Sequence, residues 1–223
     1  MLSRSLLPIP LPSLSAYEDI EKVTAKNELI KERAENYDVA PQKASYEEFL
    51  KLTENNDERY EYIDGEIYLL ASPKAIHQKI LSELHFLFYN WFQGKKCRPM
   101  LAPFDITLKR NQEKINVVQP DLMVICDLEE KLDERDYYMG VPTLVIEILS
   151  ESTRSKDMIK KLDLYMSTGI KEYWIINPFS REVSIYLFEE NSISKNVTYK
   201  NHETAVSYHF NGLEVSIEMI FGG

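Results

Sequence analysis

The chain has 223 residues, of which 44% are hydrophobic and 28% charged, and its net charge is −10 at pH 7. Its length suits one sizeable domain with an extension, and no apolar run approaches the roughly 20 residues that a membrane-spanning helix needs, so no membrane association is expected. The acidity argues against a general affinity for nucleic acid, while two cysteines without metal-ligand spacing, Cys97 and Cys126, argue against a zinc site or a disulfide framework and favour the reducing cytoplasm.

The first 41 residues differ in composition from the rest of the chain. Three prolines interrupt the apolar opening, which therefore does not have the pattern of a signal peptide. The segment that follows, YEDIEKVTAKNELIKERAENY, is highly charged and has few apolar residues, as is typical of a solvated helix. We therefore predict an N-terminal arm and charged helical extension over residues 1–41, and a single domain over residues 42–223.

Two short elements are predicted next. Ser45 followed by Glu48 forms a capping-box pattern at the start of a helix over about 45–54. The alternating sequence RYEYIDGEIYLL then predicts a β-hairpin, because Asp64-Gly65 suits a two-residue type I′ turn.

A long amphipathic helix and several strands follow. Apolar residues at helical spacing predict a helix over 75–92. Four apolar segments then predict strands: MLAPFDITL, NVVQPDLMVIC, PTLVIEIL and KEYWIIN. Between the last two, a helix over about 155–168 can be capped by Ser152, Thr153 or Ser155 and is ended by Gly169, which indicates a parallel strand–helix–strand crossover. VSIYLF and GLEVSI predict further strands near the end of the chain.

Three polar residues interrupt these apolar elements. Asp121 begins a core-like strand, and Glu147 lies in the middle of the next one. Lys161 lies on the following helix, on one face with Asp157 and Tyr165. If the two strands pair, their carboxylates converge at one edge of the sheet, where they repel unless a cation neutralises them. A hard divalent ion such as Mg²⁺, which takes oxygen ligands, would supply that charge.

Each carboxylate also has an ordinary structural interpretation. Asp121 follows a proline and could simply be a turn or strand-end residue. Glu147 could be a structural carboxylate paired with Arg154, Lys160 or Lys161. Taken alone, neither residue is specific.

The remaining candidates have ordinary alternatives too. Lys161 could be a solvated helix lysine, and His77 a surface or capping residue. Tyr165 suits the core, and Glu61 could face water from its hairpin strand. The signal lies in the order and spacing of the residues.

The ordered motifs QPDLMVI, LVIEILSEST, DMIKKLDLY and GIKEYWIINP resemble the PD-(D/E)XK nuclease superfamily. With YEYIDGEI, SPKAIHQKIL and APFDITL, the chain resembles more narrowly the Uma-two family of restriction-endonuclease-like proteins, over about residues 42–221. The resemblance, together with the order of elements, implies an α/β fold: a restriction-endonuclease-like mixed sheet of about four core strands flanked by the two helices, with the hairpin in front.

The resemblance also assigns residues. Asp121 corresponds to the aspartate of the PD motif and Glu147 to the glutamate of the E-x-K element. Leu149 stands where the superfamily has lysine, and Lys161 takes the place of the lysine that substitutes for it in the family. Glu61 and His77 match further polar positions, and Asp105 is a weaker candidate.

The implied reaction is hydrolysis of phosphodiester bonds in nucleic acid, most simply DNA. Asp121, Glu147 and the Ile148 carbonyl would hold one Mg²⁺ or Mn²⁺ ion, and Lys161 would orient water or stabilise charge. Glu61 would contact the metal through water, and His77 a water or the phosphate. Local positive charge would come from two basic clusters, which a partner or a second copy in a homodimer could complete: Arg154, Lys156, Lys160 and Lys161; and Lys95, Lys96 and Arg98.

A second hypothesis is that the chain is a nuclease-fold scaffold or binding protein without catalysis. Leu149 and the net negative charge favour the scaffold. The joint presence of Asp121, Glu147 and a replacement lysine favours the enzyme.

Overall fold

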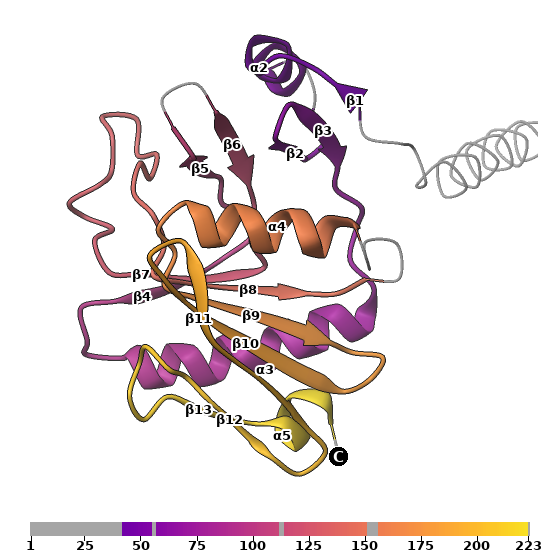
Figure 1. The fold of residues 1–223 in the computed structure, drawn as a ribbon, viewed down its shortest axis with the longest axis vertical. Helices are drawn as coiled ribbons and strands as arrows, with labels where there is room; N and C mark the ends of the chain where they lie inside the picture. Colours follow the sequence, from indigo (N-terminus) through magenta and orange to yellow (C-terminus); the bar gives the residue numbers. More distant parts are fainter. Residues whose placement is uncertain (1–41, 55–56, 112–113, 151–155, 223) are drawn as a thin grey trace, which may run out of the picture. The chain divides into compact units, whose positions relative to one another are not determined.

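A six-stranded mixed sheet lies between helices in the described part of the chain (Figure 1). The computed structural model describes residues 42–54, 57–111, 114–150 and 156–222, without the side chains of 156–158. The predicted arm and helical extension, the three candidate caps before the second long helix, and Arg154 therefore lie outside the described residues.

The strands of this main sheet lie in the order β11-β10-β9-β8-β7-β4. They are β4 (Arg98–Leu101), β7 (Leu122–Ile125), β8 (Leu144–Ile148), β9 (Glu172–Asn177), β10 (Glu182–Glu189) and β11 (Ser192–Lys200). Neighbours pair antiparallel, except that β8 and β9 are parallel. The strand that begins after Asp121 therefore pairs directly with the strand that contains Glu147.

The parallel pair is joined by helix α4 (Lys156–Ser167), as predicted. Parallel strands need such a crossover, since a tight turn cannot bring the chain back to the same end of the sheet. Gly169 follows the helix with φ of 96°, a left-handed conformation that glycine adopts without steric cost.

A second, five-stranded sheet has the order β1-β3-β2-β6-β5. Its strands are β1 (Gln42–Lys43), β2 (Tyr60–Ile63), β3 (Glu66–Leu69), β5 (Ile106–Lys109) and β6 (Ile115–Val118). The predicted hairpin is β2–β3. Asp64 and Gly65 both have positive φ, 49° and 81°, as a type I′ turn requires.

Helix α2 (Tyr46–Glu54) begins with the predicted capping box. The Ser45 backbone N–H donates to Glu48 Oε2 at 2.7 Å, and the Glu48 N–H donates to Ser45 Oγ at 3.3 Å. The helix packs Phe49 against Tyr62 of the second sheet. The local signal therefore fixed where this helix begins.

Two segments predicted as single strands are each split at a proline, which corrects the prediction. MLAPFDITL becomes β4 and β5, and NVVQPDLMVIC becomes β6 and β7, with each half in a different sheet. Pro103, which follows a cis peptide bond, and Pro120 have no backbone N–H to continue a strand ladder. Asp121 thus lies where the chain passes from one sheet to the other.

The end of the chain holds more structure than was predicted. VSIYLF and GLEVSI contribute to β10 and β13 (Glu214–Ser216), as expected. Three elements were not predicted: β11, whose segment SISKNVTYK is mostly polar and mostly exposed, β12 (Thr204–Val206) and the short helix α5 (Ile217–Phe221).

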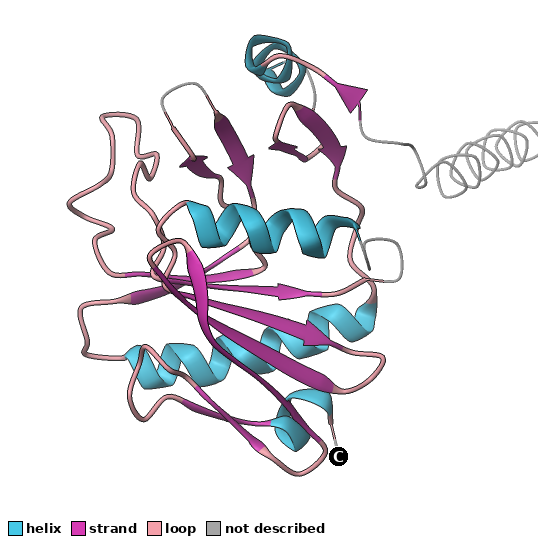
Figure 2. Ribbon diagram, in the orientation of Figure 1, coloured by secondary structure: helices cyan, strands magenta, loops and turns pink. Residues whose placement is uncertain are grey.

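Side chains of the main sheet alternate between two hydrophobic cores, one on each face. On β8, Leu144, Ile146 and Ile148 pack on the face covered by α3 (Ala75–Phe92). Val145 and Leu149 pack on the other face, with α4 and the second sheet. Figure 2 shows the two long helices on opposite sides of the sheet. Successive side chains of a strand point to opposite faces, so Glu147 belongs to the α4 face.

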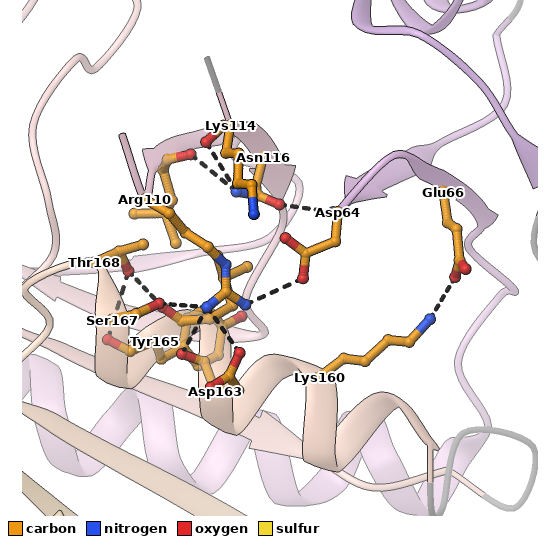
Figure 3. A network of polar contacts seen from close by, with 12 residues as sticks. Asp64, Glu66, Arg110, Lys114, Asn116, Lys160, Asp163, Tyr165, Ser167 and Thr168 are labelled. Atoms are coloured by element: carbon orange, nitrogen blue, oxygen red, sulfur yellow. Dashed lines mark hydrogen bonds and ion pairs between the residues drawn. The ribbon is translucent and has the colours of Figure 1, made fainter. Parts of the chain in front are cut away.

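Helix α4 is fixed to the second sheet by ion pairs (Figure 3). Arg110, directly after β5, pairs with Asp163 at 2.7 Å and with Asp64 of the hairpin turn at 3.1 Å. Nearer the start of α4, Lys160 pairs with Glu66 of β3. The position of α4 relative to the β2–β3 hairpin is therefore set by polar contacts from the middle of the helix, at Lys160 and Asp163.

The prediction that the cysteines do not form a disulfide was wrong: the structure pairs Cys97 with Cys126. Arg98 pairs with Ile125 in the β4–β7 ladder, so the next residue outward on each strand is a cysteine, and the two side chains meet. Residues far apart in sequence became direct neighbours through strand register, which the spacing alone did not indicate. None of the described helices is long and apolar enough to span a membrane.

Candidate active site

Asp121 and Glu147 lie opposite each other on neighbouring strands. Leu122 pairs with Ile146, so the next position of this antiparallel register sets Asp121 against Glu147. Strand alternation directs Glu147 to the α4 face. Asp121 Oδ2 also accepts a hydrogen bond from the Ile148 backbone N–H at 2.7 Å. This bond holds the Asp121 carboxylate against the end of β8.

Glu147 is bound by two donors from α4. Lys161 Nζ and the Tyr165 hydroxyl donate to the same oxygen, Glu147 Oε1, at 2.9 and 2.6 Å. Lys161 also donates to Glu61 Oε1 of β2 at 2.9 Å. The one-face spacing of Lys161 and Tyr165 explains why both reach the carboxylate. The structure therefore brings Glu61, Glu147 and Lys161 together with only 12% of the lysine side chain exposed.

Burial and the neighbouring charges shift the pKa values of Glu147 and Lys161. Burial raises the pKa of Glu147 to about 7, and the nearby carboxylates of Asp121 and Glu61 add to the shift, while Lys161 opposes it. Burial disfavours the charged form of Lys161, but Glu147 and Glu61 outweigh it and hold the lysine pKa well above its usual value. Lys161 is therefore a permanent cation, and Glu147 a carboxyl group that a further cation would keep ionised.

His77 contacts Asp121 from the first turn of α3. Its Nε2 lies 3.1 Å from Asp121 Oδ2. Burial disfavours the charged form, but the hydrogen bond to Asp121 raises the histidine pKa overall. The other ring nitrogen, Nδ1, is buried and has no hydrogen-bond partner among the described residues. His77 is thus neither a surface residue nor a helix cap.

Glu61 is buried, with 3% of its surface exposed, and does not face water. Besides Lys161, its Oε1 accepts the Gln119 backbone N–H at 2.9 Å. The Gln119 side chain donates to Asp105 Oδ1 at 2.8 Å, and Asp105 itself is exposed. Gln119 was not among the predicted site residues, and its only signal in the sequence is its place directly before the Pro-Asp pair.

The carboxylate and carbonyl oxygens near Asp121 and Glu147 are suitable ligands for a small, hard cation. Leu149 N–H donates to Ile176 O of β9, so the carbonyl of Ile148, in the same trans peptide, points to the opposite side, where Asp121 lies. Two carboxylates and one carbonyl match Mg²⁺, which keeps several waters. No group of three or more His, Cys, Asp and Glu side chains among the described residues could hold a metal, so water and the carbonyl would have to complete the set.

Only one of the two predicted basic clusters lies near the site. Lys95, Lys96 and Arg98 follow the far end of α3. Phe92, the last residue of this helix, lies 15 positions after His77, or about 22 Å at 1.5 Å per residue. This loop therefore does not line the site, and Lys96 there pairs with Glu130. Lys160 lies next to the site but pairs with Glu66. The Lys156 side chain is outside the described residues.

The chain is similar in sequence to known proteins. The model of the Uma2 family, described as "Putative restriction endonuclease", matches residues 46–218. The chain is 31% identical over 145 residues to the uncharacterized protein slr1290 of Synechocystis sp., a match covering 65% of this chain and 74% of that protein. A second uncharacterized Synechocystis protein, sll1609, is 25% identical over 140 residues, covering 62% of this chain and 77% of its own.

A solved structure shares the fold. It is a crystal structure from Anabaena variabilis described as "a putative nuclease belonging to DUF820", with a TM-score of 0.62 and 23% identity. The match covers 79% of this chain and 97% of that one. The predicted fold class, a mixed sheet of restriction-endonuclease type flanked by helices, is confirmed.

Proposed function

Because the chain belongs to the Uma2 family, we propose that it is a metal-dependent endonuclease that hydrolyses phosphodiester bonds of nucleic acid, with DNA as the substrate. The observation that carries the proposal is the cross-strand pair of Asp121 and Glu147, with a buried lysine bound to Glu147. Three residues from separate elements thus combine the charges that this reaction requires.

Asp121, Glu147 and the Ile148 carbonyl are the proposed ligands of one Mg²⁺ or Mn²⁺ ion. A divalent ion supplies a bound water of lowered pKa and neutralises charge that develops on the phosphate. Burial raises the pKa of Glu147, and the carboxylates of Asp121 and Glu61 raise it further, so a cation bound here would stabilise the ionised form of Glu147.

Lys161 is the proposed replacement for the lysine that Leu149 displaces. Leu149 is buried on the α4 face, two residues beyond Glu147. The Lys161 ammonium approaches that face from α4 and lies 2.9 Å from Glu147. A lysine from either position could thus reach Glu147. Lys161 would orient water or stabilise charge on the phosphate.

Glu61 and His77 are proposed to support these residues. Glu61 holds the Lys161 ammonium, and its link to the Gln119 N–H ties that lysine to the segment that carries Asp121. His77 Nε2 would orient Asp121, while the other ring nitrogen, Nδ1, is buried and has no hydrogen-bond partner among the described residues.

The substrate class makes the cytoplasm the proposed compartment, although the Cys97–Cys126 disulfide is unusual there. With Lys160 paired and the 95–98 loop remote from the site, DNA affinity is expected to be weak. A second copy of the chain could complete the basic surface.

The test of the function is direct. Purified protein should cleave DNA when Mg²⁺ or Mn²⁺ is present, and EDTA should stop the reaction. Asp121→Asn, purified in parallel, controls for contaminating nucleases. If DNA and RNA both remain intact with either ion, and calorimetry detects no Mn²⁺ binding, the chain is the catalytically inactive scaffold, with Lys161 and Glu147 as a structural ion pair.

The affinity for Mn²⁺ should depend on pH with a definite sign. Glu147 binds a cation only when ionised, and its pKa is raised to about 7, so protons compete with the metal below that pH. We expect affinity to fall up to about tenfold per unit as pH decreases below 7, and to level off above about pH 8. Calorimetry at pH 5.5, 7 and 8.5 measures this, and a constant affinity would contradict it.

A further inference from the structure

Tyr165 was predicted to be a core residue, and its ring does lie in the core. The residue is fully buried on α4, and its ring packs edge-on against Tyr173, with ring centroids 5.0 Å apart. Its hydroxyl, however, donates to Glu147 Oε1 at 2.6 Å. A residue that only filled space would not need this hydroxyl.

The two oxygens of Glu147 are in different situations. Oε1 accepts both Tyr165 and Lys161, whereas Oε2 accepts no hydrogen bond from any described residue. Since the backbone of Glu147 is fixed in β8, two donors on one oxygen restrict rotation of the carboxylate. Oε2 is then the oxygen that a cation can use without displacing a protein donor.

We infer that Tyr165 is a positioning residue, which holds Glu147 Oε1 so that Oε2 is presented to the divalent ion. The inference rests on the proposed metal-dependent function. It makes Tyr165 and Lys161 joint determinants of metal affinity, because groups that orient a metal ligand contribute to affinity without touching the metal.

Two phenylalanine variants separate positioning from packing. Tyr165→Phe keeps the ring and removes only the hydroxyl. Tyr173→Phe is the matched control: its ring is equally buried and packs against Tyr165, but its hydroxyl takes no part in the described hydrogen bonds to Glu147.

The experiment is calorimetric titration of the full chain with Mn²⁺, together with thermal unfolding of each variant. Tyr165→Phe should weaken Mn²⁺ binding about tenfold, and Tyr173→Phe less than about twofold, since losing an orienting group costs about 10- to 100-fold. DNA cleavage by Tyr165→Phe should recover when the Mn²⁺ concentration is raised, because the defect is in metal affinity.

Failure of the positioning role and failure of the proposed function give different results. If the wild type binds Mn²⁺ and Asp121→Asn does not, but Tyr165→Phe binds like the wild type, the positioning role is wrong and the proposed function stands. Equal weakening in both phenylalanine variants also overturns it, since packing would then explain the loss. If the wild type binds no Mn²⁺, both proposals fall.

Discussion

Replacing Asp121 by asparagine should weaken Mn²⁺ binding and reduce DNA cleavage by about 10²–10³-fold, the loss of rate seen when one charge-stabilising group of an active site is removed. The amide oxygen can still accept from the Ile148 N–H and from His77, so the local structure should persist. What is lost is the negative charge beside Glu147. The defect should therefore appear in metal binding and cleavage and leave the fold intact.

Cleavage rates and Mn²⁺ calorimetry measure this effect, and thermal unfolding verifies the fold. Asp105→Asn is the control, since it removes the same charge from an exposed carboxylate that accepts a hydrogen bond from Gln119, two residues before Asp121. It should change both quantities by less than about twofold, as expected for a screened surface charge. Equal loss in the two variants would mean that general charge, and not a site at Asp121, governs activity.

Lys161→Met should destabilise the protein by about 3–5 kcal/mol at pH 8, the usual cost of removing one partner of a buried ion pair. The lysine side chain is 12% exposed and binds both Glu61 and Glu147. Without it, two carboxylates remain together in the core with no cation. Cleavage should also be lost.

The defect should shrink as pH falls. The pKa of Glu147 is already raised to about 7 and should rise further in the variant, so the folded state takes up a proton at neutral pH. A group whose folded pKa is raised stabilises the folded state when protonated and loses that contribution as pH increases. Urea unfolding of Lys161→Met at pH 5.5 should therefore show a smaller loss of stability than at pH 8.

The neighbouring lysine provides the control. Lys160 pairs with Glu66, but its side chain is 34% exposed, so Lys160→Met should cost at most about 1 kcal/mol, as for other solvent-screened pairs. A double variant, Lys161→Met with Glu147→Gln, should recover much of the lost stability because fewer unpaired charges remain. Equal effects of the two lysine variants would contradict a special role for Lys161.

Elements with local signals were predictable from the sequence. The capping box at Ser45 and the Asp64-Gly65 turn depend on residues within a few positions of each other, and both were found where predicted. The crossover between the strands of Glu147 and Trp174 followed from the order of a strand, a helix and a strand. In each case the determining contacts are short-range in the chain.

The incorrect predictions concern segments whose pairing partners are distant in the chain. Pro103 and Pro120 were visible in the sequence, but nothing local showed that the halves on either side of each proline join different sheets. The cysteine pair depends on the β4–β7 register. Strand β11 has little hydrophobic signal because it is an exposed edge strand, held by its ladder to β10.

The sequence by itself determined which residues are candidates: acids inside apolar strands stand out because burial of a lone carboxylate is costly. Only the tertiary structure decided how the candidates are paired. Lys161 joins Glu147, 14 residues away, to Glu61, 100 residues away, while Tyr165 and Lys161 share a single oxygen. Such pairings depend on how α4 and the hairpin pack against each other, and packing between distant segments leaves no periodic or local pattern in the chain.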